Sequence, residues 1–432
     1  MIEEADICFD GLTVIAGEND TGKSTIGKLM FSLIKTFNRY ERDARLYQAR
    51  NIQTIIDDYY FDSRKKANDP NFLEIGRSLF EELKNSALEL LGTNKSKKQI
   101  ESFISQRVSV YTEAIQGISG FKINMKEIIE RIVNIILKKP LKEDVFKQTF
   151  SMYADAVLNG DIANKFAADK NYTIIGKEGD LTIFHVSGSP ASIEMSLNDR
   201  LYFEDATFFE SPVILNLADT IRFSKTGFDK NGDTKKQAEL LEKAYVPEYV
   251  KDLILKLTDH STKGMQSRIA NSIQEIIRGE FYYDPDIRDF VFKKRNQIFI
   301  GVSITPGIKY LGALGILSLA GFISNKNLLV IDEPETHIHP QWQVRLAEVI
   351  VKMIEAGNYI LLTSHSPYFI EALKLYSDDG PAGDKTAFYY SEVKELQPVS
   401  RIVNVTHDIS PIFDVLAEPF EKLEHLQLRD AS

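Results

Sequence analysis

The stretch "GENDTGKST", residues Gly17–Thr25, holds a glycine, four intervening residues, and then Gly22, Lys23 and Ser24. Glycines at the two ends let the backbone curl tightly, so that successive N–H groups point inward at an anion. Lys23 adds a positive charge beside the terminal phosphates of such an anion, and the Ser24 hydroxyl can coordinate Mg²⁺. This spacing is the P-loop pattern G-x-x-x-x-G-K-[ST].

The segments on either side of the loop fit this pattern. "LTVIAG", residues 12–17, is a short β-branched apolar run, as expected of a buried strand. "KSTIGKLMFSLIKTF", residues 23–37, places its apolar residues on one helical face, and the start of a helix favours phosphate. The alternative is a structural turn without a ligand. We predict a nucleotide site at Gly17, Glu18, Asn19, Asp20, Thr21, Gly22, Lys23, Ser24 and Thr25.

Composition and charge limit the class of protein. The 432 residues suffice for one large domain and a subdomain, and 43% hydrophobic with 26% charged residues is typical of a globular cytoplasmic protein without a membrane span. The single cysteine excludes a disulfide framework or a cysteine-rich zinc site. The net charge of −10 argues against nucleic acid covering the whole surface. Basic clusters at Lys138-Lys139 and Lys293–Arg295 leave local DNA contact open, although such clusters are also common on solvated faces.

The order of local patterns predicts a split domain. Helical patterns follow the first helix to about residue 168, short β-type runs fill 171–215, and a second helical block covers 218–278. A hairpin and alternating strands and helices come next. We therefore predict an α/β P-loop fold whose head comprises residues 1–37 and 171–432, with a helical lobe at about 218–278 and a helical insertion subdomain at 38–170.

A second conspicuous stretch is "NLLVIDEPETHIHP", residues Asn327–Pro340. Its apolar run, residues 328–331, predicts a buried parallel strand, and Asp332 and Glu333 stand where that strand ends. Ligands of open α/β sheets bind at this edge. Asp332 can hold Mg²⁺ opposite the serine of the loop, and Glu333 can orient or deprotonate a water that attacks the γ-phosphate.

One helix further on, "NYILLTSHSP" predicts another buried strand, ending in Ser364 and His365. His365 can therefore face the same phosphate as the acidic pair. His337 and His339, two residues apart beside carboxylates, leave a metal pair as an alternative.

Together these motifs resemble the ATP-binding-cassette-like (ABC-type) ATPases of the RecF, SMC and OLD type. "DEPE" resembles their Walker B motif, "THIHP" the D-loop, which also accounts for its two histidines, and "TSHSP" the switch-histidine motif. The resemblance implies an ABC-ATPase-like head that hydrolyses ATP with Mg²⁺. It implies that Asp332 supports the metal, Glu333 activates water and His365 senses the γ-phosphate.

The resemblance also implies a signature loop that a second subunit supplies in trans. "VSITPGIKYLG", residues Val302–Gly312, occupies its place before Walker B. Thr305 keeps a hydroxyl and Gly307 a close backbone approach, whereas the neighbouring proline and isoleucine depart from the usual Leu-Ser-Gly-Gly-Gln. Thr305, Gly307 and Lys309 are the predicted contacts to a neighbouring subunit's nucleotide. A head-to-tail dimer or higher oligomer follows.

The glutamine of the family's Q-loop has no clear counterpart. The strand pattern "ATFFESPVIL", residues 206–215, occupies its region, with Glu210-Ser211-Pro212 in place of glutamine. A structural and a functional role both stay open there.

The combination of "GEN-x-x-GKST", "FESP", "GIK-x-LG" and "DEPETHIHP" is most similar to the ATPase subunits of two-component anti-phage defence systems, such as Septu, PARIS and retron-associated systems. The residues after His365 are too few for the Toprim domain of OLD nucleases, so a separate effector, expected to be a nuclease, is implied. Its docking surface is expected on the helices of 38–168, the block at 218–278 or the C-terminal tail, with "IIERIVNIIL" (128–137) as a candidate. The alternatives are a RecF-like DNA-repair ATPase and a non-hydrolysing, ATP-bound scaffold that sequesters a partner.

Overall fold

A seven-stranded sheet forms the centre of the computed structural model, which describes residues 2–66, 70–116, 124–158, 162, 171–189, 192–223, 246–259, 265–393 and 399–416. The strand order is β1-β13-β12-β2-β11-β10-β6. The strands from β12 to β6 all run parallel, whereas β13 runs antiparallel to β12 and pairs in parallel with β1. Their bounds are β1 Ile2–Ala5, β2 Leu12–Ala16, β6 Asp205–Phe209, β10 Asn327–Asp332, β11 Tyr359–Ser364, β12 Thr386–Val393 and β13 Ser400–Asn404.

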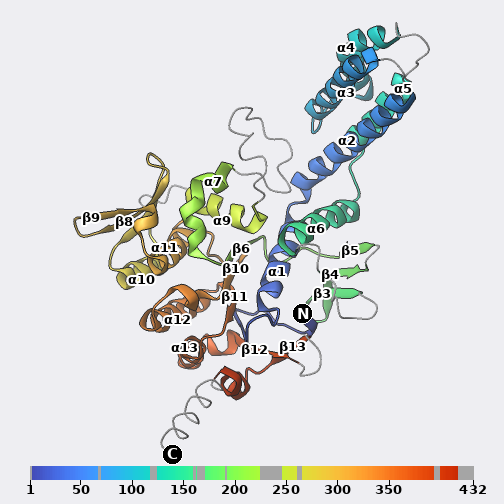
Figure 1. Ribbon diagram of the computed structural model, residues 1–432. Helices are drawn as coiled ribbons and strands as arrows, with labels where there is room; N and C mark the ends of the chain where they lie inside the picture. The colour runs from blue at the N-terminus through green and yellow to red at the C-terminus, as the bar shows by residue number, and fades with distance from the viewer. Residues whose placement is uncertain are drawn as a thin grey trace, which may run out of the picture. The chain divides into compact units, whose positions relative to one another are not determined.

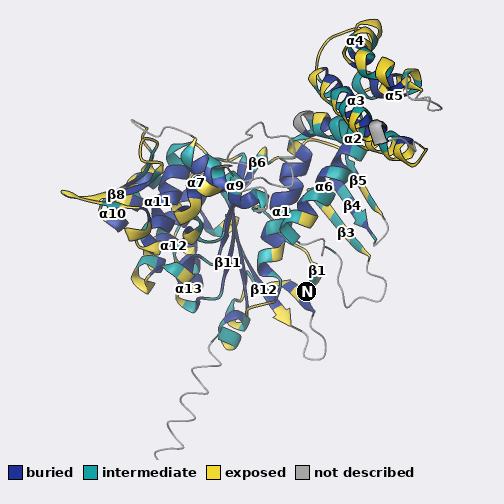
Figure 2. Ribbon diagram, turned by 45° about the horizontal axis from the view of Figure 1, so that its top comes forward, coloured by how far each residue is buried: buried dark blue, intermediate teal, exposed yellow. Residues whose placement is uncertain are grey.

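Helices cover both faces of this sheet. Helix α1 (Lys23–Asn38) lies on one face, and α12 (Pro340–Glu355) and α13 (Pro367–Asp378) lie on the other (Figure 1). Strands β2 and β10 are buried along their whole length, as expected of parallel strands covered on both sides. The neighbouring β11 is drawn mostly in the colour of buried residues (Figure 2). The P-loop sequence connects β2 to α1. The predicted α/β P-loop fold is therefore confirmed.

Two smaller antiparallel sheets flank the centre. The first contains β3 (Tyr172–Glu178), β4 (Leu181–Gly188) and β5 (Ile193–Leu197), in agreement with the predicted β-type runs. The second contains β7 (Glu280–Asp284), β8 (Asp289–Lys294) and β9 (Gln297–Ile300). The predicted hairpin has this third strand because the chain turns back at Arg295, whose φ is 54°.

The strand predicted through residue 215 is wrong in its second half. Strand β6 ends at Phe209, and the 3₁₀ helix η1 (Pro212–Leu217) follows. Pro212 has no backbone N–H for a strand ladder, and its fixed φ suits the first position of a helix. The Ser211 hydroxyl caps that helix by accepting from the Val213 N–H.

The predicted helical block at 218–278 contains α7 (Ala218–Phe223), α9 (Glu248–Thr258) and α10 (Arg268–Ile277), while residues 224–245 and 260–264 lie outside the described residues. Helix α9 is tied to α1 and β6 by four alternating charges, of which the two lysines are buried and the two aspartates are partly buried. The Lys256 ammonium lies 2.7 Å from Asp205 and 2.8 Å from Asp252, and Lys35 contacts the same two carboxylates. Each charge thus has opposite charges beside it, which offsets the cost of burial.

The chain falls into two compact units. The first unit is Met1–Asn38 with Phe150–Ser432, and the second unit is Arg39–Thr149. The division into a head and an insertion at 38–170 stays a prediction. The second unit holds α2 (Tyr40–Lys66), α3 (Pro70–Glu89), α4 (Lys97–Gln116), α5 (Met125–Leu137) and the beginning of α6 (Lys142–Leu158). No helix among the described residues is long and apolar enough to cross a membrane.

The second unit has a hydrophobic core of its own. Ile128, Ile132 and Val133 of α5 are fully buried in it. The apolar stripe considered as a docking face is therefore largely consumed by this core, and Leu137 at its end is 46% exposed.

Two helical glycines give a matched test of the packing of α1 on the sheet. A Cβ on Gly27 would lie 2.7 Å from Val330 Cγ1, whereas a Cβ on Gly315 of α11 (Pro306–Leu319) would meet only one side-chain atom, at 3.7 Å. We expect Gly27→Ala to lower the free energy of unfolding by about 1–3 kcal/mol through overpacking. Gly315→Ala should leave it unchanged or raise it by up to about 1 kcal/mol.

Urea unfolding followed by the fluorescence of Trp342, the single tryptophan, measures both changes. Equal midpoints for the two variants would contradict the close approach of α1 to β10.

Candidate functional site

The parallel strands bring the predicted site residues to one edge of the sheet. Asp332 at the end of β10 pairs with Thr363 of β11, and Ser364 of β11 pairs with Ala16 of β2. The segments that follow these three strands therefore begin side by side. This edge brings together the P-loop, the acidic pair and the turn that carries His365.

The P-loop is held in a tight curl. Gly17 and Gly22 have φ values of 147° and 88°, which residues other than glycine rarely adopt. A Cβ on Gly22 would lie 2.8 Å from Ile2. The Thr21 carbonyl accepts hydrogen bonds from the hydroxyls of Ser391 (3.1 Å) and Ser400 (2.6 Å). The C-terminal strands β12 and β13 thus fix the outer side of the loop.

The inner side of the loop has the chemistry of an anion site. Among the described residues, no hydrogen bond occupies the backbone N–H groups of residues 19–24. Lys23 is 3% exposed, and its ammonium donates to the carbonyls of Gly17 (2.9 Å) and Glu18 (2.5 Å). Burial lowers the Lys23 pKa, against the opposing effect of Glu333 and other carboxylates. A buried cation beside free N–H groups fits a polyphosphate.

Asp332 and Ser24, the predicted metal ligands, contact each other. The buried Asp332 carboxylate accepts from the Thr363 hydroxyl at 2.5 Å and from the Ser24 hydroxyl. Burial raises the Asp332 pKa, and these two hydrogen bonds act against the rise. A hydroxyl and a carboxylate are oxygen donors of the kind that Mg²⁺ takes together with phosphate and water. The pair therefore fits a magnesium ion bound with a nucleotide.

Glu333 lies between Lys23 and His365. Its backbone is left-handed, with φ 45° and ψ 57°, and its N–H donates to Thr363 at 3.2 Å. Its Oε1 lies 3.9 Å from the Lys23 ammonium and 3.5 Å from Nδ1 of His365. A strained backbone at such a position is common where a side chain must be aimed.

Glu335 is a residue that the sequence prediction missed. Its buried carboxylate accepts hydrogen bonds from the turn after β11, and burial raises its pKa. The short polar stretch "PETH" gives no sign that this carboxylate is buried. The cluster of serine and histidine donors after the strand is the only signal in the sequence that could have suggested a carboxylate partner.

Glu210 stands at the same edge, directly after β6. Its carboxylate accepts from the Tyr249 hydroxyl of α9 at 2.9 Å and lies 3.5 Å from the Lys28 ammonium of α1. Its charge also contributes to the raised pKa of Asp332. Glu210 is therefore a carboxylate that links α9 to this edge of the sheet.

The predicted signature residues differ in exposure. Thr305 is exposed at the start of α11, and Gly307 packs so closely that a Cβ would lie 2.9 Å from the His337 carbonyl. Lys309 is 3% exposed, and its ammonium hydrogen-bonds to the side chain of Asn216. Thr305 is thus on the surface, whereas Lys309 is turned into its own chain.

His337 and His339 contact different neighbours. His337 Nε2 lies 3.2 Å from the Ser211 hydroxyl, and burial lowers its pKa. His339 caps α12 by accepting from the Gln341 N–H at 3.2 Å. Within the described ranges no cluster of three or more His, Cys, Asp or Glu side chains that could hold a metal ion occurs.

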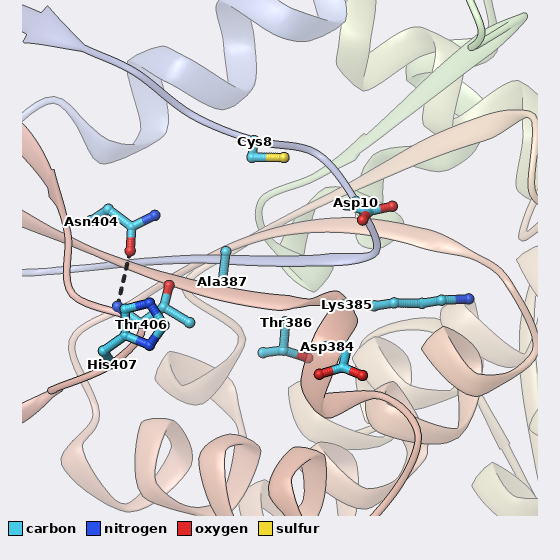
Figure 3. A pocket seen from close by; sticks show the side chains of 9 residues that line it. All are labelled: Cys8, Asp10, Asp384, Lys385, Thr386, Ala387, Asn404, Thr406 and His407. Atoms are coloured by element: carbon cyan, nitrogen blue, oxygen red, sulfur yellow. Dashed lines mark hydrogen bonds between the residues drawn. The ribbon is translucent and has the colours of Figure 1, made fainter. Parts of the chain in front are cut away.

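A separate cavity of about 220 Å³ lies at the other ends of β2 and β12 (Figure 3). Cys8 and Asp10 line it near the start of β2, and Asp384 lies near the start of β12. On its other side the Asn404 side chain accepts a 3.0 Å hydrogen bond from the Thr406 N–H. None of the predicted site residues lines this cavity.

One segment of the chain is similar to a known protein family. Residues 307–371 match a family described as "AAA domain, putative AbiEii toxin, Type IV TA system". This segment runs from α11 into α13 and includes Asp332, Glu333 and His365. The segment is therefore similar to AAA-type ATPases. No protein of curated function matches the chain.

The solved structures that are similar to this chain include SMC head domains, all at low TM-scores. An Smc head bound to the C-winged helix domain of ScpA is 10% identical over 92% of this chain and 91% of its own, at a TM-score of 0.38. An SMC head domain from Thermotoga maritima is 11% identical over 54% and 73%, at 0.30. A Pyrococcus furiosus Smc head with an extended coiled coil, bound to the C-terminal domain of ScpA, is 11% identical over 95% and 93%, at 0.28.

Proposed function

We propose that this chain binds ATP with Mg²⁺, hydrolyses it, and acts as the ATPase subunit of an anti-phage defence complex. One observation carries the ATPase proposal. Lys23, Glu333 and His365 come from three segments that are far apart in the sequence. Nevertheless, Oε1 of Glu333 lies 3.9 Å from the Lys23 ammonium and 3.5 Å from Nδ1 of His365. The family match of residues 307–371 supports the same activity.

Each residue has a chemical task in this proposal. The free N–H groups of the loop and the Lys23 ammonium bind the β- and γ-phosphates, while Ser24 and Asp332 hold the metal that neutralises the developing charge. Glu333 accepts a hydrogen bond from the attacking water and takes its proton. His365 contacts the γ-phosphate from the neighbouring strand end.

We further propose a head-to-tail dimer or higher oligomer in which Thr305 of one copy completes the site of another. Thr305 is exposed at the N-terminus of α11, where the helix dipole favours an anion. The adjoining 3₁₀ segments η1 and η2 (Gly301–Ser303) contact each other and expose apolar side chains. Val213, Leu217 and Val302 are 51%, 57% and 82% exposed. An apolar surface beside Thr305 supports burial against a second copy.

A separate effector, proposed to be a nuclease, supplies the damaging chemistry, because ATP hydrolysis alone does not stop a phage. The combined sequence motifs and the toxin-like family description of residues 307–371 support a role in defence over a role in DNA repair. Nucleotide-dependent assembly would gate the effector by a shift between two populations.

Two substitutions separate binding from turnover. Lys23→Ala should weaken ATP binding about 10- to 100-fold, because the charged contact to the phosphates is lost. Glu333→Gln should keep ATP affinity and lower kcat about 10²- to 10⁴-fold, because the water loses its base. Fluorescent-nucleotide titration and phosphate release measure the two quantities.

Equal loss of ATP affinity in both variants would contradict the role of Glu333. A wild-type chain that binds ATP and releases no phosphate would favour the non-hydrolysing scaffold instead.

Mixed oligomers test the contribution of Thr305 in trans. Substitution at Gly307 would clash within its own chain, so Thr305→Arg is the cleaner lesion. When Lys23→Ala and Thr305→Arg chains are mixed, one composite site carries both lesions and the other carries none. We expect each variant alone to be inactive and the mixture to recover part of the phosphate release.

No recovery after mixing, with both variants folded and able to exchange subunits, would contradict a shared site. Full turnover by a strictly monomeric wild-type chain would contradict it as well.

The defence role is tested in cells. We expect the chain expressed together with the product of its neighbouring gene to reduce phage plaque formation, and Lys23→Ala to abolish the protection. The chain expressed alone should give no protection. Protection by the chain alone, or cleavage of nucleic acid by the purified chain, would contradict a separate effector.

A further inference from the structure

The turn after β11 is attached to one buried carboxylate. Oε1 of Glu335 accepts from the Ser364 hydroxyl at 2.7 Å, the His365 N–H at 2.6 Å and the Ser366 N–H at 3.1 Å. The Glu335 side chain is 4% exposed, so water does not compete for these bonds. Three donors on one buried oxygen fix the backbone of the turn with respect to the 3₁₀ segment Pro334–His337 that carries Glu335.

The imidazole of His365 faces two carboxylates. Its Nδ1 lies 3.4 Å from Oε1 of Glu335 and 3.5 Å from Oε1 of Glu333. Within the described part of the chain, neither this nitrogen nor Oε2 of Glu335 makes a hydrogen bond, although both atoms are buried. A carboxylate beside one ring nitrogen orients the ring and leaves the other nitrogen for a ligand.

We propose that Glu335 is a positioning residue for hydrolysis, which holds His365 with Nδ1 toward Glu333 and Nε2 available to the γ-phosphate. The inference rests on the proposed ATPase function and deepens it. Glu335 itself lies behind the histidine and acts on the reaction only through it.

Gln343 of α12 provides a matched control. Its amide donates to the Ile338 carbonyl at 3.2 Å and accepts from the Ser366 hydroxyl at 2.8 Å. It is buried and joins the same two turns as Glu335, yet its hydrogen bonds in the described structure go to the turns and not to the imidazole. Loss of Gln343 therefore loosens the turns without removing the carboxylate beside the ring.

The test is a double-mutant cycle on ATP hydrolysis by the full chain. Glu335→Gln keeps the side-chain volume and should lower kcat about 10- to 100-fold, as loss of an orienting partner does, with ATP affinity unchanged. In a His365→Ala background the same substitution should have no further effect, because the group through which it acts is gone. Gln343→Leu should have a smaller effect, additive with His365→Ala.

A second readout does not need turnover. In the nucleotide-free protein, the rate at which diethyl pyrocarbonate modifies His365, measured by mass spectrometry, should rise in Glu335→Gln and stay unchanged in Gln343→Leu. The exposed His407 serves as an internal reference.

Additive effects of Glu335→Gln and His365→Ala, or an unchanged modification rate, would overturn the inference. A wild-type chain without ATPase activity would refute the proposed function, while the modification rate would still decide whether Glu335 orients the imidazole.

Discussion

The parallel register of β2, β11 and β10 is the constraint on which the rest of the site depends. Ala16 pairs with Ser364 and Thr363 pairs with Asp332, so the three strands end at the same level of the sheet. A slip of one residue would move a strand end by about 3.3 Å and turn its side chains to the opposite face. Because Glu333 lies 3.5 to 3.9 Å from its neighbours in the site, such a slip would separate them. The ladder of backbone hydrogen bonds thus sets the site geometry.

Burial of charge opposes this arrangement. Lys23, Asp332 and Glu335 are all nearly inaccessible to solvent. Burial shifts the pKa of each in the direction that favours its neutral form. The apolar strands around them supply the stability that such charges do not, since a buried ion pair rarely gains more than its desolvation costs. A bound polyphosphate with its metal would add opposite charge beside Lys23 and Asp332. Such a ligand would therefore stabilise the edge more than the charges of the edge itself do.

Much of the site could be predicted because its signals are local. The glycine spacing of residues 17–22 and the carboxylates after an apolar run are readable along the chain, and the rule that ligands bind at the carboxyl ends of parallel strands brings them together. Glu335 could not be predicted, because its burial depends on donors some thirty residues away that only the fold places beside it. The contact of Glu210 with Tyr249 could not be predicted for the same reason, because Tyr249 belongs to a separate helix. The end of β6 was predictable from Pro212, which outweighs the apolar residues after it.

The start of α11 shows how an exposed residue can be coupled to the buried carboxylate. Gly307 lies against the His337 carbonyl, and Lys309 hydrogen-bonds to Asn216 of η1, so the first turn of the helix is fixed on two sides. His337 belongs to the same short 3₁₀ segment as Glu335 (η3, Pro334–His337). A contact that displaced the exposed Thr305 would therefore press on the segment that we propose orients His365. Packed interiors transmit such displacements because they contain little free volume. The same short helix end thus connects the surface proposed to meet a second copy with the group proposed to sense the γ-phosphate.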